Sequence, residues 1–422
     1  MSQPFVERFP SMTNGRTADR SMFILGVLVI ALQRVGVPAG SFIFPVAPLI
    51  LLVFLAILFV RGAVAVSGVA LSIWAIFVAF ALALSATTDT SVTSVIQIAL
   101  LWLPIAVLPR NLSSNRFLAG AVLATSVSGA FGFIQSTVSA AMPVFPDPLA
   151  SLPSSILVPG FNDTYAVVWG GHWMKANGGL FLEPSFLSLF SALALLAVLT
   201  GAVRVGRWRV ICMLTLLAGL LSSVAVSGLV LAPVFLVWAI VRMRQALPYA
   251  IGIVIAIPLI RYLPQTAAIV DRATNVEGTS DSMRLVLPYT NLVPQALQAS
   301  PLVGLGPGSA HAITLSLAAQ GSDGLITTPT AAKMIYEYGL VGVVFLALAV
   351  LYLGTRSNMP GLFVIAVLVA LIVPTDGLTS GVLVPVSIFA LTRVSDRDLR
   401  AQRIQPTSEL ARIPARRELI TR

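Results

Sequence analysis

Charged residues are scarce in this sequence. Only 10% of its 422 residues are Asp, Glu, Lys or Arg, and 57% are hydrophobic, whereas a soluble domain carries about 25% charged residues. A chain of this length cannot hide so much apolar surface from water, as its mean hydropathy of +0.94 also indicates. The composition excludes a water-soluble protein and predicts a polytopic membrane protein.

Cysteine is scarce as well. The single one, Cys212, excludes a disulfide framework and any cysteine-based metal site. No metal-binding cluster is visible in the sequence, and we expect no cofactor. The net charge of +10 would suit a nucleic acid partner, but many of the arginines crowd into the two terminal tails. That placement is typical of orientation by the positive-inside rule and of contact with lipid headgroups, so we expect membrane lipid and no nucleic acid as a partner.

Long apolar runs fill the rest of the chain. Since a helix needs about 20 apolar residues to cross a bilayer, we predict an all-α transmembrane bundle. Its twelve candidate spans lie near residues 21–37, 41–60, 63–85, 92–109, 116–140, 184–203, 209–223, 225–241, 247–264, 332–353, 360–375 and 378–392. The seventh and eighth are the weakest, because residues 209–241 must make a tight hairpin near Ser222, Ser223 and Ser227-Gly228.

The arginines assign the two sides of the membrane. The short connections on the inner side hold Arg61, Arg110, Arg116, Arg204, Arg207, Arg209, Arg242, Arg244 and Arg356. The exceptions, near outer helix ends, are Arg34 and Arg261. The pattern predicts cytoplasmic tails at 1–20 and 393–422 around a membrane domain at 21–392. Two long loops, 141–182 and 265–331, then lie outside.

The second outer loop contains an amphipathic pattern. Arg284, Asn291, Gln295 and Gln298 share one helical face and apolar residues take the other. The pattern predicts a helix at the outer interface, kinked or divided by Pro288 and Pro294. The open alternative is a loop helix resting on the membrane, with its arginine reaching lipid headgroups.

A glycine-rich turn follows this helix, at Gly304, Gly306 and Gly308, and His311 comes just after it. The backbone N–H groups of such a turn can approach an anion closely. We therefore regard these residues as candidates for contact with a phosphate.

The first outer loop ends in a second polar segment. His172 and Lys175 precede a flexible Asn177-Gly178-Gly179, and Glu183 stands at the mouth of a span whose first turn contains Pro184. A carboxylate at a helix N-terminus is stabilised by the helix dipole alone. An ionisable group at a membrane helix end is equally a candidate functional residue, and both interpretations stay open.

A third polar segment begins the span after the second loop. Lys333 and Glu337 are spaced i, i+4 and can form a simple ion pair, while Gly339 and Gly342 permit close helix contact. Each of these segments alone has a structural explanation. Their order along the chain and their common side of the membrane favour a functional role over a purely structural one.

That order resembles the Wzy-type polysaccharide polymerase and O-antigen ligase superfamily. The matching features are an outer-loop Arg284, the "P-x-x-G-x-G" of Pro301–Gly306, the acid and "G-x-x-G" of Glu337–Gly342, and the segment "FLEPSFLSLF" around Glu183. The ligases place a histidine about eleven residues before the first glycine of "G-x-x-G", where this chain has Thr328-Pro329 instead. This departure favours a polymerase. The arginine usual in the family's first loop is also replaced, with Lys175 as the nearest cation.

The resemblance implies a GT-C-like glycosyltransferase of the bacterial inner membrane that joins undecaprenyl-diphosphate-linked oligosaccharide repeats into exopolysaccharide or O-antigen. A chain-length regulator and a flippase would be partners. Arg284 would hold the diphosphate, with help from Lys175 and Lys333, and Glu183, His311 or His172 would be the base. The implied catalytic residues are Arg284, Glu183 and His311. The implied substrate contacts are Lys175, His172, Asn291, Gln295, Gly304, Gly306, Gly308, Lys333 and Glu337.

Three other classes of protein stay open. The first is a ligase that transfers finished glycan to another acceptor. The second is a secondary transporter, for which twelve spans with both termini inside is a familiar arrangement. A transporter should carry its charges inside the spans near the midplane, whereas here the spans are nearly free of charge and the ionisable groups collect in the outer loops. The third is a structural assembly partner.

Overall fold

The computed structural model describes residues 15–39, 42–88, 90–109, 114–158, 165–167, 173–242, 286–313, 328–355, 357 and 359–374. The described chain is mostly helical, with a few short strands. The predicted spans at 247–264 and 378–392 and the C-terminal tail at 393–422 lie outside these residues. The first helix begins at Gly15, inside the segment predicted as the N-terminal tail.

Every predicted span within the described residues contains a helix. The long helices are α1 (Gly15–Ala31), α2 (Val46–Val60), α3 (Gly68–Thr88), α4 (Val92–Trp102), α5 (Ser114–Ala141), α6 (Pro184–Thr200), α7 (Arg209–Ser222), α8 (Ala232–Val241), α14 (Thr330–Thr355) and α15 (Gly361–Ile372). A shorter helix, α12 (Val293–Ala299), continues a π-helical turn, η5 (Pro288–Leu292). The 3₁₀ segments are η1 (Leu103–Ala106), η2 (Ser154–Ile156), η3 (Gly206–Trp208) and η4 (Val226–Leu231).

Short antiparallel strand pairs occupy the connections. They are β1 (Gly36–Ala39) with β2 (Phe42–Pro45), β3 (Val64–Val66) with β4 (Val107–Pro109), and β5 (Tyr165–Ala166) with β6 (Met174–Lys175). Parts of four predicted spans, near 36–37, 42–45, 64–66 and 107–109, are therefore strands. The hairpin predicted near Ser222 is confirmed: α7 ends at Ser222 and the chain returns through η4 and α8.

Three described helices are long and apolar enough to cross a membrane: Gly68–Thr88, Arg116–Ala141 and Thr330–Thr355. The other apolar helices have 10–17 residues, which at about 1.5 Å per residue reach about 15–26 Å, less than a hydrocarbon core of about 30 Å. The fold is compatible with a membrane protein. A bundle of twelve spans is not confirmed.

Large apolar side chains lie on the outside of the bundle. Val60 is 85% exposed, Ile76 71% and Leu236 62%, and each belongs to a different helix. Soluble proteins rarely expose wide apolar patches, whereas lipid tails solvate such side chains well. The outer surface therefore fits a lipid environment.

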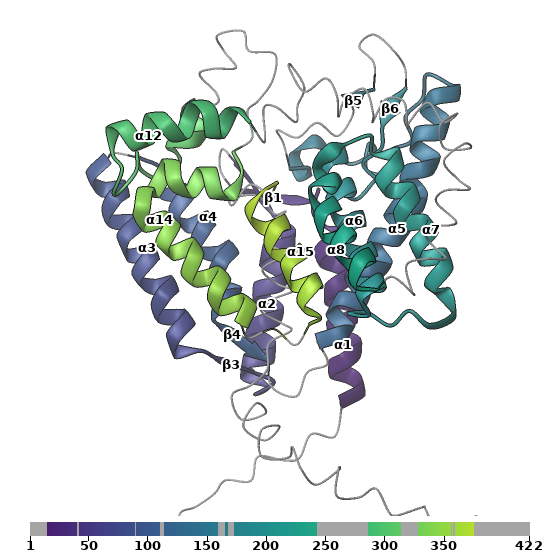
Figure 1. Cartoon of the computed structure of the whole chain (residues 1–422), viewed down its shortest axis with the longest axis horizontal. Helices are drawn as coiled ribbons and strands as arrows, with labels where there is room; N and C mark the ends of the chain where they lie inside the picture. Colours follow the sequence, from purple (N-terminus) through teal and green to yellow (C-terminus); the bar gives the residue numbers. More distant parts are fainter. Residues whose placement is uncertain are drawn as a thin grey trace, which may run out of the picture.

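The helices form two groups with two helices between them (Figure 1). α3, α4, α12 and α14 make one group and α1, α5, α6, α7 and α8 the other, while α2 and α15 lie in the middle. The two ends of the bundle differ. β5, β6 and α12 lie at one end, which we call the loop end, and the β3–β4 pair lies at the opposite end.

Candidate functional site

Charged side chains are buried toward the loop end and exposed at the opposite end. Among the described residues, the buried charged side chains are Arg34, Lys175, Glu183, Lys333 and Glu337. The arginines of the connections at the opposite end are exposed: Arg61, Arg204, Arg207, Arg209 and Arg242. Burying a charge is costly unless other groups compensate it. Ionisable groups at the loop end are therefore buried, whereas ionisable groups at ordinary helix ends are exposed to solvent.

The first cluster surrounds the start of α6. Glu183 is the N-cap residue, and its carboxylate accepts a hydrogen bond from the Ser185 hydroxyl at 2.8 Å. Its side chain does not cap the helix backbone, although the helix dipole favours a carboxylate there. The hairpin after α7 closes over this point, because the Ser227 hydroxyl donates to the Ser185 carbonyl at 2.7 Å. Glu183 is therefore a buried carboxylate at a helix N-terminus.

Lys175 lies on β6, buried and separated from Glu183 by a tightly held segment. The Gln135 amide donates to Asn177 Oδ1 at 3.1 Å and accepts from the Gly178 N–H at 2.8 Å. The turn Asn177-Gly178-Gly179 is therefore tied to α5 through Gln135. Lys175 and Glu183 are held by an ordered connection.

Arg34 anchors the same connection and is a residue that the sequence did not assign to the site. Its guanidinium donates to both carboxylate oxygens of Asp147 at 2.8 Å and to the Gly179 carbonyl at 3.0 Å. These contacts bridge 113 and 145 positions of the chain. One feature of the sequence could have identified Arg34. It is an arginine near an outer helix end, against the positive-inside pattern, and such an arginine needs a local partner.

We expect Arg34→Met to lower the free energy of unfolding by about 3–5 kcal/mol, because it leaves the Asp147 carboxylate buried without its cation. The double variant Arg34→Met/Asp147→Leu should recover most of that loss. Arg116→Met is the matched control: Arg116 is 59% exposed and 3.8 Å from Asp19, so about 0–1 kcal/mol is expected. Thermal unfolding in detergent measures all three. Equal losses for Arg34→Met and Arg116→Met would contradict the role of the buried ion pair.

The second cluster is built around a break in α14. Gly339 has φ 57° and ψ −143°, a conformation outside the helix. The glycine-rich turn closes this break with four backbone hydrogen bonds. The N–H groups of Leu305 and Gly306 donate to the carbonyls of Tyr336 and Glu337, and those of Leu340 and Val341 donate to the carbonyls of Pro301 and Leu302. The two motifs that the sequence presents separately therefore form one junction.

Among the glycines of the turn, Gly304 and Gly306 donate their amide N–H groups to protein carbonyls. Besides the Leu305 and Gly306 bonds, the Gly304 N–H donates to the Ser300 carbonyl at 3.0 Å, and the Pro307 carbonyl accepts from the Ser91 N–H at 3.1 Å. Gly304 and Gly306 are buried and Gly308 is half-buried against the α3–α4 connection. The observed role of these glycines is packing, and their contact with a substrate anion stays a prediction.

Lys333 and Glu337 lie on the part of α14 before the break. Both are buried, and Glu337 has 0% exposure. The π-helical turn η5 packs against this part of α14, because the Tyr289 hydroxyl makes a hydrogen bond with the backbone of Ala332. Burial raises the pKa of the Tyr289 hydroxyl, and that hydrogen bond lowers it in part. The phenol is therefore neutral at physiological pH.

A helix is present in the second loop where the sequence predicts one. Its polar residues Asn291 and Gln295 are exposed, and Leu292 and Ala296 are buried in a small apolar cluster with Tyr336 of α14. The predicted interruption is also present, as the π-helical turn begins at Pro288 before α12 starts. Leu292 and Ala296 thus pack on protein, whereas the neighbouring Leu297 is 48% exposed. His311, beyond the glycine turn, is exposed.

The structure brings the candidate residues together in two clusters. Lys175 and Glu183 belong to the α6 cluster, and Lys333, Glu337 and the glycine turn to the α14 cluster. Both clusters lie toward the loop end, in different helix groups (Figure 1). Arg284 and His172 lie outside the described residues.

Comparison with protein-family models and with curated protein sequences gives no match. The class of protein is therefore defined by the fold and the site alone. The chain is mostly helical, is compatible with a membrane location, and buries ionisable side chains toward one end.

Proposed function

We propose that this protein is a membrane-embedded glycosyltransferase of the bacterial inner membrane, a polymerase of lipid-linked oligosaccharide repeats. It would join undecaprenyl-diphosphate-linked repeat units at the outer face. The observation that carries the proposal is the burial of Lys175, Glu183, Lys333 and Glu337 toward the loop end of the bundle. Ionisable groups buried in membrane proteins usually serve substrates or proton transfer.

The reaction has a simple balance. A hydroxyl of the acceptor sugar attacks the anomeric carbon of the donor, the bond from that carbon to the diphosphate breaks, and the lipid diphosphate leaves. A base takes the hydroxyl proton, and cations stabilise the charge that develops on the diphosphate. In our proposal Arg284 is the main cation, with Lys333 or Lys175 beside it.

Glu183 is the base that the structure supports best. It is buried next to the start of α6, where a carboxylate is stable, and its neighbour Ser185 orients one of its oxygens. His311 is exposed, which suits a base less well in a site that must exclude water. Burial strengthens electrostatic interactions because less water screens them.

A secondary transporter is the second candidate function. The break in α14 at Gly339 is the observation that favours it, since broken helices form substrate sites in transporters. Against it, Glu183 is the N-cap residue of α6 and Lys333 lies in the first turn of α14, while Glu337 lies further along α14, two residues before the break. A ligase that passes finished glycan to another acceptor would use the same groups as a polymerase.

We expect Glu183→Gln to reach the membrane at normal level. It should make roughly 10²–10⁴-fold less polymer, because loss of a general base usually costs that much in rate. If Glu183 only interacts with the helix dipole, an effect of about 0.3–1 kcal/mol should leave polymer unchanged. The assay is complementation of a deletion strain, with polymer read on gels. Asp19→Asn, at the start of α1, is the control and should behave as wild type. Wild-type polymer from Glu183→Gln would reject Glu183 as the base.

The proposed orientation makes a separate prediction. Reporter fusions at Asp163 and Asp323 should read as external, and fusions at Arg207 and Arg400 as cytoplasmic, because arginine-rich short connections stay inside. Paired alkaline phosphatase and green fluorescent protein fusions measure this. A cytoplasmic signal at Asp323 would place the α14 cluster on the wrong side for an extracytoplasmic polymerase.

A further inference from the structure

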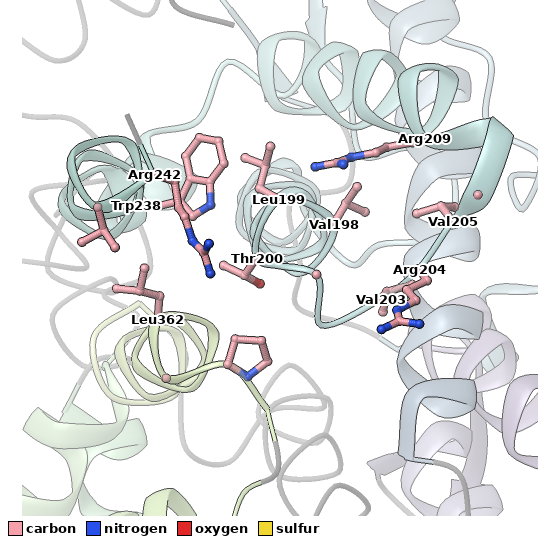
Figure 2. A pocket seen from close by; sticks show the side chains of 15 residues that line it. Val198, Leu199, Thr200, Val203, Arg204, Val205, Arg209, Trp238, Arg242 and Leu362 are labelled. Carbon is pink, nitrogen blue, oxygen red and sulfur yellow. The ribbon is translucent and has the colours of Figure 1, made fainter. Parts of the chain in front are cut away.

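A cavity opens at the end of the bundle opposite the loop end. Its volume is about 730 Å³, and it lies where α6 and α8 end and α15 begins. The walls come from three helix ends and from the connection between α6 and α7 (Figure 2). The cavity shares no residue with either candidate cluster at the loop end, so the proposed transferase chemistry does not account for it.

The polar side of this cavity is basic. Arg204, Arg209 and Arg242 line it, and its lining contains no acidic residue within the described chain. The salt bridges between described residues, Arg34–Asp147 and Arg116–Asp19, do not involve these arginines. Figure 2 shows the guanidinium groups of Arg209 and Arg242 directed toward the end of α6 from two sides.

The helix dipole does not explain all three arginines. Arg242 follows the C-terminus of α8, where a cation is favoured, but Arg209 is the first residue of α7, where it is not. The first turn of α7 also contains no acidic residue. An anion bound in the cavity would stabilise the positive charge of Arg209 at this helix N-terminus.

The other walls are apolar. Leu199, Trp238, Val241 and Leu362 contribute side chains to the same cavity, and tryptophan is favoured where one edge meets lipid and the other meets headgroups. A cavity that combines arginines with apolar walls fits an amphiphile with an anionic head. A free anion would contact the arginines but not the apolar walls.

We propose that this cavity binds the phosphate of an anionic phospholipid headgroup, with the acyl chains leaving along the apolar walls. The volume lies within the range of about 300–1,000 Å³ that is typical of ligand sites. Basic pockets between membrane helices on the cytoplasmic side are suited to such headgroups. The inference is independent of the glycosyltransferase proposal.

The test uses the purified full-length protein in neutral detergent, with bound lipid counted by native mass spectrometry. The probes are phosphatidylglycerol and phosphatidylcholine with the same acyl chains, and inorganic phosphate as a competitor. We expect phosphatidylglycerol to be retained about tenfold more than phosphatidylcholine, as expected for a few arginines near an anionic headgroup. The double variant Arg209→Gln/Arg242→Gln should lose this preference.

The control is Arg61→Gln/Arg207→Gln, which removes the same charge outside the cavity. Both residues are exposed, and Arg207 lies over the Trp208 ring, 5.4 Å from its centroid. Retention of phosphatidylglycerol by the control, together with its loss from the cavity variant, supports the proposal. Equal loss from both variants, equal retention of phosphatidylcholine, or displacement of phosphatidylglycerol by millimolar inorganic phosphate would each overturn it.

Discussion

Arg284→Ala is expected to abolish polymer while single lipid-linked repeat units accumulate and the protein level stays normal. In the sequence, Arg284 comes four positions before η5, and η5 packs on α14. A cation that contacts a diphosphate away from bulk water stabilises its charge far more than an exposed cation does, because less water screens the interaction. Its loss should slow glycosidic cleavage by on the order of 10²–10³-fold.

Arg284→Lys separates charge from geometry. Lysine keeps the positive charge but lacks the planar fork that binds two phosphate oxygens together, so we expect polymer between the wild-type and alanine levels. The measurement is complementation of a deletion strain, with polymer read on gels and repeat units by mass spectrometry. Arg207→Ala, an exposed arginine at the opposite end, is the control and should be neutral. If Arg284→Ala makes wild-type polymer, this arginine is only a headgroup anchor.

Gly304→Ala should lower the free energy of unfolding by about 2–5 kcal/mol, from backbone strain together with overpacking. Gly304 has φ 73°, and a methyl group there would overlap the backbone of Glu337 and Tyr338 at the break in α14. The four hydrogen bonds of the junction cannot form while that overlap persists. Because the junction positions Lys333 and Glu337, polymer should fall with stability.

Gly62→Ala is the matched control for this substitution. Gly62 has nearly the same backbone angle, φ 68°, but nothing lies within 4 Å of an added methyl group. It should therefore report the backbone strain alone, about 1–2 kcal/mol. Thermal unfolding in detergent compares the two variants. Equal losses would show that close packing at the junction contributes nothing.

The helices were predictable because apolar runs are a local property. The lengths of the helices were not predictable, because an apolar run shows which residues avoid water and does not show which of them are helical. The predicted span 92–109 contains α4, the 3₁₀ turn η1 and the strand β4. α4 ends just before Pro104, and β4 pairs with β3, a segment more than forty positions earlier.

The candidate site was predictable in its parts but not in its assembly. The "P-x-x-G-x-G" turn and the "E-Y-G" segment were recognisable in order, yet only the folded chain shows that each supplies hydrogen bonds to the other. Arg34 was visible as an exception to the charge pattern, but its partner Asp147 lies 113 positions away. Such long-range contacts leave no periodic signal in a single sequence.

The apolar face of the second-loop helix illustrates the same limit. Leu292 and Ala296 alternate with polar residues as in a helix that lies on a membrane. In the structure they pack against Tyr336. Hydrophobic periodicity identifies a face that avoids water, but it does not distinguish lipid from protein as the neighbour.

The most direct measurement of the central claim is a reaction with purified components. The protein is reconstituted with undecaprenyl-diphosphate-linked repeat units, and both glycan length and released undecaprenyl diphosphate are followed by mass spectrometry. We predict a ladder of glycans on lipid, with one undecaprenyl diphosphate released for each new linkage, and no ladder with Arg284→Ala. Unchanged single repeats and no released diphosphate, with folded wild-type protein present, would contradict the proposal that this chain is a polymerase.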